Sequence, residues 1–176
     1  MRQVILLRGI NLGPNRRVPM AELRALLAEA GFQNVRTYVQ SGNVVLDSDG
    51  SPAELEAQTA TLISEKFGFA VPVVSRTAAE LAAVVDHDPF GELVTEPKRY
   101  QVSFLDQPPS SGVIQALQDA VAEPEAVTVN GREIYAWHPE GVARSKLWNK
   151  LAGGSLGVAA TARNWTTVCT LLEMAT

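Results

Sequence analysis

One order of secondary structure occurs twice along this chain of 176 residues, and this repetition constrains the fold more than any other feature. Short apolar or alternating runs, typical of strands, are separated by runs of helical periodicity in the order strand, helix, strand, strand, helix, strand. In the first half, the expected strands are residues 4–7, 35–40, 44–47 and 71–74, and the expected helices are 19–30 and 52–67. In the second half, the expected strands are 100–105, 127–129, 134–137 and a weak run within 155–160, and the expected helices are 110–121, 142–151 and one from 165 onward.

The connections between these elements carry specific turn and cap signals. Asn130-Gly131 is the strongest hairpin signal, because both residues tolerate a positive φ. Ser41-Gly42-Asn43 predicts a second hairpin in the first half. At Ser51 and at Thr77, a glutamate follows three residues later, which is the spacing of a capping box and predicts that a helix begins there.

We therefore expect an α+β protein made of two tandem ferredoxin-like (βαββαβ) plaits with antiparallel sheets. The expected division is an N-terminal subdomain over residues 1–76, a helical connector over 77–98, and a C-terminal subdomain over 99–176 that ends in a helix. The first strand of each plait should pair antiparallel with the third. Parallel pairing of residues 4–7 with residues 44–46 would contradict this fold.

Composition narrows the class of protein. With 46% hydrophobic and 19% charged residues, the chain has enough apolar material for a core and is not a disordered segment. No apolar run approaches the roughly 20 residues of a membrane helix, and the single cysteine, Cys169, excludes an internal disulfide. We expect a cytoplasmic protein without a membrane partner.

Known cofactor and catalytic motifs are absent from the sequence. The run from Arg8 to Gly13 lacks the spacing of a dinucleotide or phosphate loop. Two histidines, His87 and His138, leave little for a metal site, and no Ser-His-acid set is recognisable. We expect no cofactor and no metal.

Basic residues gather at two segments of a chain whose net charge is -4. Residues 1–21 contain four arginines and no acid, and residues 141–172 contain four basic residues and no acid. An acidic surface repels nucleic acid, but two acid-free basic segments need not. Charge clusters of this size also arise without a function.

The expected topology supports a ligand-binding site at the first basic segment. In the expected plait, the end of the first strand and the hairpin after the second strand lie at the same edge of the sheet. This edge would bring Arg8 and Asn11 close to the polar hairpin at Gln40–Asn43, with Arg16 and Arg17 in the adjoining loop. Arginine forks and glycine backbones suit a phosphate or a carboxylate. Alternatively, the asparagines and Ser41 only hold two turns in place.

The second basic segment contains Arg163, which we expect at the start of the terminal helix with Asn164 or Thr161 as its cap. A cation there opposes the helix dipole unless an anion compensates it. The residues expected to bind an anionic ligand are Arg8, Asn11, Arg16, Arg17, Gln40, Ser41, Asn43, Arg144, Lys146, Arg163 and Asn164. Whether the two segments meet in one cleft is left open.

Aromatic residues give a second binding hypothesis. Tyr100 and Phe104 share one face of a strand, and Tyr135 and Trp137 share a face of another, as the stacking residues of RNA-binding plaits do. The RNA-reading consensus is absent, and Glu133 on the same face would repel phosphate. We expect these rings to serve packing between domains.

Four segments of the sequence resemble an uncharacterised bacterial family, domain of unknown function 1697. These segments are Leu6–Asn11, Val18–Met20, Arg36–Val44 and Thr161–Trp165. The resemblance spans essentially the whole chain and implies a cytoplasmic protein with two ferredoxin-like subdomains. It brings no reaction, cofactor or substrate.

The leading hypothesis is a binding module for a nucleotide, a sugar phosphate or an RNA phosphate. The alternatives are a small enzyme acting on a phosphorylated metabolite and a structural or partner protein without a ligand. We expect Arg8, Asn11, Asn43 and Arg163 to matter more for ligand binding than for stability. The oligomeric state stays open.

Overall fold

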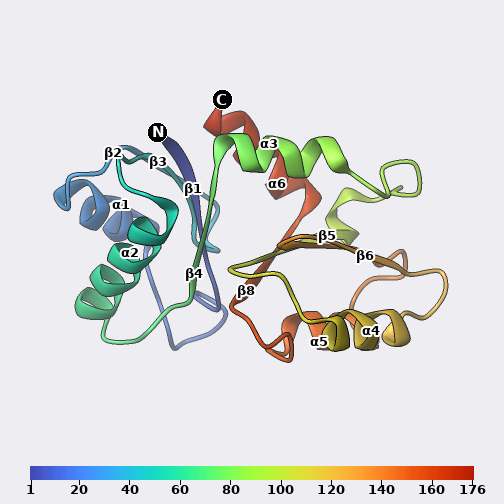
Figure 1. The fold of residues 1–176 in the computed structure, drawn as a ribbon. Helices are drawn as coiled ribbons and strands as arrows, with labels where there is room; N and C mark the ends of the chain where they lie inside the picture. Colours follow the sequence, from blue (N-terminus) through green and yellow to red (C-terminus); the bar gives the residue numbers. More distant parts are fainter. The chain divides into compact units, whose positions relative to one another are not determined.

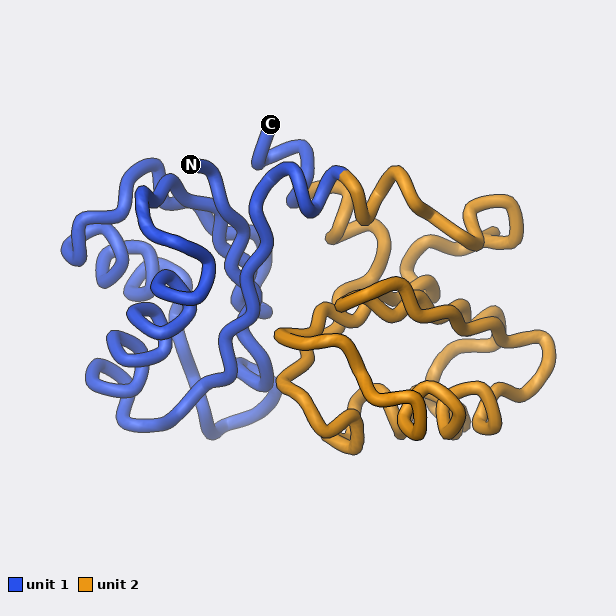
Figure 2. The backbone as a smooth tube through the Cα atoms, viewed as in Figure 1, with its two compact units in different colours: residues 1–82, 171–176 blue, residues 83–170 orange.

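The computed structural model describes residues 1–176, and these form two compact units (Figure 2). Unit 1 comprises Met1–Ala82 and Leu171–Thr176, and unit 2 comprises Ala83–Thr170. Both divisions fall inside helices, within α3 (Ala78–His87) and within α6 (Trp165–Ala175). The subdomain boundaries expected at residues 76/77 and 98/99 stay a prediction.

Unit 1 contains one four-stranded antiparallel sheet and two helices on one of its faces (Figure 1). Its elements are β1 (Arg2–Leu7), α1 (Met20–Glu29), β2 (Gln33–Tyr38), β3 (Asn43–Asp47), α2 (Pro52–Phe67) and β4 (Val73–Thr77). The strand order is β2-β3-β1-β4. Strands β1 and β3 pair antiparallel, with Val4 opposite Val45, so the expected antiparallel pairing is confirmed.

Unit 2 contains a second sheet with the corresponding order, β6-β7-β5-β8, again antiparallel. Its elements before α6 are η1 (Pro97–Arg99), β5 (Tyr100–Leu105), α4 (Ser111–Ala120), β6 (Ala126–Asn130), β7 (Glu133–Trp137), α5 (Lys146–Ala152) and β8 (Ala160–Asn164). Two antiparallel sheets with six α-helices confirm the expected α+β class.

The local turn and cap signals form the expected contacts. The Ser51 side chain and Glu54 make a reciprocal capping box at the start of α2. At the start of α3, Glu80 N donates to Thr77 Oγ1 and Thr77 N donates to Glu80 Oε2. Strands β6 and β7 pair up to Asn130 opposite Glu133, so the hairpin forms with a two-residue loop of Gly131 and Arg132, one residue later than the expected Asn130-Gly131 turn.

Two expectations for the end of the chain are wrong. The last strand, β8, lies at residues 160–164 and not within 155–160, because Gly154 and Gly157 adopt φ values of +78° and +74° and turn the chain before it. Helix α5 begins at Lys146 and not at residue 142, because Ser145 caps it by accepting a hydrogen bond from Trp148 N.

The two central strands of each sheet, β1 and β3 in unit 1 and β5 and β7 in unit 2, are buried on both faces. In unit 1, Ile5, Leu7, Val44 and Leu46 pack in the core with α1 and α2. In unit 2, Ile134 and the other buried residues on the same face of the sheet pack with α4 and α5. The opposite face of β1 is equally apolar, since all of Val4–Leu7 are at most 1% exposed. Because both faces of these central strands are buried, β1 and β3 contain continuous apolar runs, Val4–Leu7 and Val44–Leu46, and do not alternate.

Candidate functional site

The long loop between β1 and α1 is fixed on the hairpin between β2 and β3, as the sequence predicted for this edge. Asn11 makes the connection: its Nδ2 donates to Gln40 O at 2.7 Å and to Val18 O at 2.9 Å. Its Oδ1 accepts from Val18 N at 2.8 Å. We call the two segments, residues 8–19 and 39–42, the loop–hairpin edge.

Arg16 belongs to the internal structure of this edge. Its guanidinium donates to Gly9 O at 3.0 Å and to Ala70 O at 2.8 Å, and it lies over the Phe69 ring at 5.0 Å from the centroid. Its backbone adopts a φ of +58°, which is uncommon outside glycine. These contacts fix the loop's conformation. Arg16 and Arg17 are both exposed.

The hairpin itself is held by a buried asparagine. Asn43 is fully buried, and its Nδ2 donates to Tyr38 O at 3.1 Å and to Ser41 Oγ at 2.9 Å. Gly42 O accepts from Leu7 N, so the hairpin is attached to the end of β1. Gln40 and Ser41 are exposed at the tip. The edge therefore presents a few polar side chains on a rigid support.

Arg163 lies in β8, opposite Val102, so the expected place at a helix N-terminus is wrong. The cause is the shift of the last strand: the helix begins at Trp165, and Asn164 caps it by accepting from Thr167 N at 2.9 Å. Arg163 is 8% exposed and donates to Thr161 Oγ1 at 2.6 Å and to Ala162 O at 2.8 Å. Burial lowers its pKa to about 10.

Arg163 has a counterpart in unit 1. Arg76 lies in β4 opposite Val4, is fully buried, and donates to Ser75 O at 2.7 Å. Each arginine is the last strand residue but one, and each precedes a residue that caps the following helix. The same structural position thus occurs in both units.

A buried polar cluster in unit 2 escaped the sequence analysis. It consists of Glu125, His138 and Ser145, and we call it the Glu125 cluster. His138 Nδ1 lies 2.6 Å from Glu125 Oε2, and Ser145 Oγ donates to the same oxygen at 2.6 Å. The His138 side chain is fully buried and the Glu125 side chain is 10% exposed. The Trp148 ring packs edge-on against the imidazole.

The order of groups in this cluster differs from that of a nucleophilic triad. The carboxylate and the hydroxyl both lie at the same ring nitrogen, His138 Nδ1, with Ser145 Oγ 3.4 Å from it, whereas a triad places them at opposite nitrogens of the imidazole. Burial raises the pKa of the Glu125 carboxyl, but hydrogen bonds from Ser145, His138 and the Ala122 amide outweigh burial and leave the pKa below its ordinary value. The arrangement holds an ionised carboxylate in one place.

The Glu125 cluster borders a pocket of about 280 Å³ in unit 2. This unit 2 pocket is lined by Ala122, Glu123, Pro124, Glu125, Pro139, Glu140, Gly141, Ala143, Arg144 and Ser145. Arg144 thus lies among three glutamates: Glu140 precedes it on the same connection, and Glu123 and Glu125 come from the connection between α4 and β6. The absence of acids from residues 141–172 does not produce a purely basic surface there.

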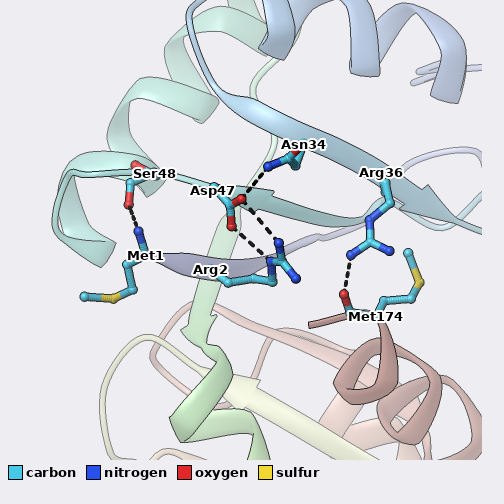
Figure 3. A network of polar contacts seen from close by, with 7 residues as sticks. All are labelled: Met1, Arg2, Asn34, Arg36, Asp47, Ser48 and Met174. Carbon is cyan, nitrogen blue, oxygen red and sulfur yellow. Dashed lines mark hydrogen bonds and ion pairs between the residues drawn. The ribbon is translucent and has the colours of Figure 1, made fainter. Parts of the chain in front are cut away.

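Unit 1 has a pocket of about 250 Å³ at the equivalent place, between the first helix and second strand and between the third strand and second helix. This unit 1 pocket is lined by Ala30, Gly31, Phe32, Gln33, Asp47, Ser48, Asp49, Gly50, Glu54, Leu55 and Gln58. Its Asp47 accepts from Arg2 Nε at 3.0 Å and from Asn34 at 2.7 Å (Figure 3). The hydrogen bonds from Arg2 and Asn34 lower the Asp47 pKa to about 2.

The neighbouring contacts close this end of the unit 1 sheet. The N-terminal ammonium donates to Ser48 O at 2.9 Å, and an Arg36 guanidinium nitrogen donates to Met174 O (Figure 3). Arg2 is therefore paired at the end of the sheet opposite the loop–hairpin edge. Of the four arginines in the first 21 residues, three lie in residues 8–19.

The aromatic residues of unit 2 are packed inside that unit. Tyr135 OH donates to Val84 O at 2.8 Å, and Tyr100 OH donates to Asp88 Oδ1 at 2.9 Å. The Trp165 ring stacks on Tyr100 at 4.8 Å. Burial raises the pKa of both tyrosines. Because both tyrosines are fully buried, they are not an open stacking surface for RNA bases.

No group of three or more His, Cys, Asp or Glu side chains is arranged to hold a metal ion. None of the helices has both the length and the apolar character needed to cross a membrane.

The fold and these sites define a two-unit α+β protein with no known catalytic constellation. The chain belongs to the family described as protein of unknown function, DUF1697, whose model matches residues 1–135. It is also similar in structure to the conserved bacterial protein SP0830 from Streptococcus pneumoniae, with a TM-score of 0.74 and 24% identity over 99% of this chain and 98% of that one. At this identity the likeness concerns the fold alone. No curated protein matches the chain.

Proposed function

We propose that this chain is a binding module for an anionic ligand, namely a nucleotide, a sugar phosphate or an RNA phosphate, and that the ligand binds at the loop–hairpin edge of unit 1. The observation that carries the proposal is the 2.7 Å hydrogen bond from Asn11 Nδ2 to Gln40 O. It fixes a loop with three arginines and no acid on the polar hairpin at the end of the sheet.

The residues of the edge divide by their contacts. Asn11, Arg16 and Asn43 bond to neighbouring protein groups, which supports a structural role in holding the edge. Arg17 and Ser41 are exposed and are the proposed ligand contacts, because a guanidinium fork and a hydroxyl both donate to phosphate oxygens. Arg8 directly follows β1 as the first residue of the basic loop.

The proposal does not extend to the basic residues of unit 2. Arg144 shares its pocket with three glutamates, which disfavour an anion. Arg163 is buried, and its hydrogen bonds to Thr161 and Ala162 support a structural role. Asn164 is engaged as a helix cap.

We also propose that each unit is a ferredoxin-like plait. The support is the element order βαββαβ together with the strand order, in which the first and third strands are central and the second and fourth are at the edges. In such a plait the first strand and the second strand end at the same edge of the sheet, which is the edge used by the proposed site.

A purely structural role of the edge is the second candidate, favoured by the three hydrogen bonds of the Asn11 side chain. Calorimetric titration with inorganic pyrophosphate, AMP and a short single-stranded RNA distinguishes the two. Arg17→Gln should weaken the binding of whichever probe binds by fivefold or more. Its melting temperature should stay within a few degrees, since exposed substitutions usually change stability by about 0.5 kcal/mol or less.

The matched control is Lys66→Gln, which removes one exposed positive charge from the last turn of α2 in the same unit. It should leave the affinity unchanged. Equal weakening by both variants would show only a general effect of net charge, and no binding of any of the three probes would support the structural role. Either result would reject the proposed site.

A further inference from the structure

The unit 2 pocket combines negative charge with apolar walls. Three glutamates and one arginine line it, so its lining carries a formal charge of -2. The rest of its wall is largely alanine and proline, from Ala122, Pro124, Pro139 and Ala143. A pocket of about 280 Å³ with such walls accepts a small aliphatic molecule, and its charge favours a cation.

The Glu125 carboxylate is held in a fixed position by the protein and still has room for a ligand donor. Its Oε2 oxygen has two close partners, His138 Nδ1 and Ser145 Oγ, each at 2.6 Å. Its Oε1 oxygen accepts only one long hydrogen bond, 3.4 Å from Ala122 N. A carboxylate oxygen accepts more than one donor, so Oε1 is able to receive a ligand N–H. Glu140, on the opposite connection, is exposed.

The equivalent pocket of unit 1 gives an internal contrast. There, Asp47 is neutralised by the Arg2 guanidinium, and Glu54 accepts from both the Ser51 backbone and the Ser51 hydroxyl. Two of its three acids thus serve an ion pair and a helix cap, and the third, Asp49, is exposed. In unit 2, Glu125 is paired through a histidine and a serine, and no ion pair with Arg144 is formed within 4.0 Å.

We propose that the unit 2 pocket is a binding site for a small aliphatic amine, with its ammonium group received by Glu125 and Glu140 and its methylene chain packed on the alanine and proline walls. Arg144 lies in the same lining and opposes the cation. This site is separate from the anion site proposed for unit 1, and it takes a ligand of the opposite charge.

Calorimetric titration of the full chain at fixed ionic strength tests the proposal with three probes of similar length. These are 1,4-diaminobutane, 1,4-butanediol and succinate. The diamine should bind, the uncharged diol should bind at least tenfold more weakly, and succinate should not bind at this pocket. Binding of the diol as tight as that of the diamine would show that charge plays no part and would overturn the proposal.

Three variants locate the site. Glu140→Gln removes an exposed carboxylate from the pocket without touching the buried cluster, and it should weaken diamine binding tenfold or more. Asp49→Asn removes one exposed carboxylate from the unit 1 pocket, so it is the matched control and should leave the affinity unchanged. Arg144→Gln should strengthen diamine binding, because it removes the opposing cation.

Two results would overturn the assignment. Equal weakening by Glu140→Gln and Asp49→Asn would mean that the diamine only follows the net charge of the protein. Succinate binding that Arg144→Gln abolishes would mean that the pocket receives an anion. Neither result would bear on the loop–hairpin edge, whose test uses pyrophosphate, AMP, RNA and Arg17→Gln.

Discussion

Units 1 and 2 have the same strand order, but they differ in the connections that leave the sheet. Between the first strand and the first helix, unit 1 has residues 8–19, whereas unit 2 has only residues 106–110. The hairpin loop spans residues 39–42 in unit 1 and residues 131–132 in unit 2. The basic edge of unit 1 is built from these longer connections, so it has no counterpart in unit 2.

The two pockets, in contrast, lie at equivalent positions in both units, and they differ in the side chains that line them. In unit 1, an arginine and an asparagine pair the pocket's aspartate, and in unit 2 a buried histidine and serine pair its glutamate. The repeated fold provides a recess at the same position, and the side chains around it determine which charge that recess accepts. Binding properties therefore have to be argued unit by unit.

The largest expected effect on stability concerns the buried Glu125 cluster of unit 2. His138→Ala removes the 2.6 Å partner of Glu125 and opens a cavity beside Trp148. The free energy of unfolding should fall by about 3 to 5 kcal/mol. Urea titration followed by tryptophan fluorescence measures the loss. Arg2→Gln, which breaks the exposed pair of unit 1, is the comparison and should lose much less. Equal losses would contradict the distinction between the two pockets.

A second prediction compares the two hairpins. A Cβ on Gly42 would lie 2.6 Å from Leu7 Cβ and 2.9 Å from Ile10 Cδ1, at a φ of +82°. A Cβ on Gly131, at a φ of +60°, would meet no atom within 4 Å. Gly42→Ala should therefore destabilise by about 3 kcal/mol and Gly131→Ala by about 1 kcal/mol. Thermal unfolding ranks the two variants, and the reverse ranking would show that the unit 1 hairpin is not packed on β1 as described.

A smaller effect is expected at Val39, in the unit 1 hairpin. This residue is 51% exposed and adopts a φ of +50°, which is strained for a β-branched side chain. Val39→Asn should raise the free energy of unfolding by about 1 kcal/mol, because asparagine tolerates this conformation. The same change at exposed Leu93, which has no positive φ, is the control and should give no gain. A loss at Val39 would indicate that its side chain supports the edge.

The smallest effect concerns pH and the unit 1 pocket. The Asp47 pKa falls from 3.8 to about 2 on folding, chiefly through the hydrogen bond from Arg2. A lowered folded-state pKa gives stability that is present above the unfolded-state pKa and is lost as pH falls through the folded-state pKa. Asp47→Asn should remove the part of the acid-induced loss that falls between about pH 4 and pH 2. Denaturant titrations across this range compare the two proteins, and parallel curves would contradict the pairing.

Local signals predicted most of the fold because they act within a few residues. The capping boxes at Ser51 and Thr77 depend on neighbouring groups alone and form as expected. The hairpin of unit 2 also forms, although its two-residue loop is Gly131 and Arg132 and Asn130 ends β6. The position of the last strand was predicted wrongly because it depends on contacts with distant residues and not on local signals. Residues 160–164 carry an arginine and an asparagine, and only burial against the rest of unit 2 makes them a strand.

The two candidate sites differ in the same way: one could be predicted from the sequence pattern, and the other could not. The loop–hairpin edge follows from strand order, which the sequence pattern predicted, and the contact between Asn11 and Gln40 agrees with it. The Glu125 cluster joins residues up to 20 positions apart that share no recognised spacing. The one local signal of this cluster was Ser145, a typical helix cap before Leu147 and Trp148. The sequence prediction missed it because it placed the start of the helix at residue 142.

The membership of residues 171–176 in unit 1 has a consequence for biosynthesis. Leu171 is 1% exposed, and Met174 receives the hydrogen bond from Arg36 on β2. A ribosome makes these residues after the whole of unit 2. Domains generally fold as units, in order of emergence, but unit 1 of this chain completes its contacts only after unit 2 has been synthesised.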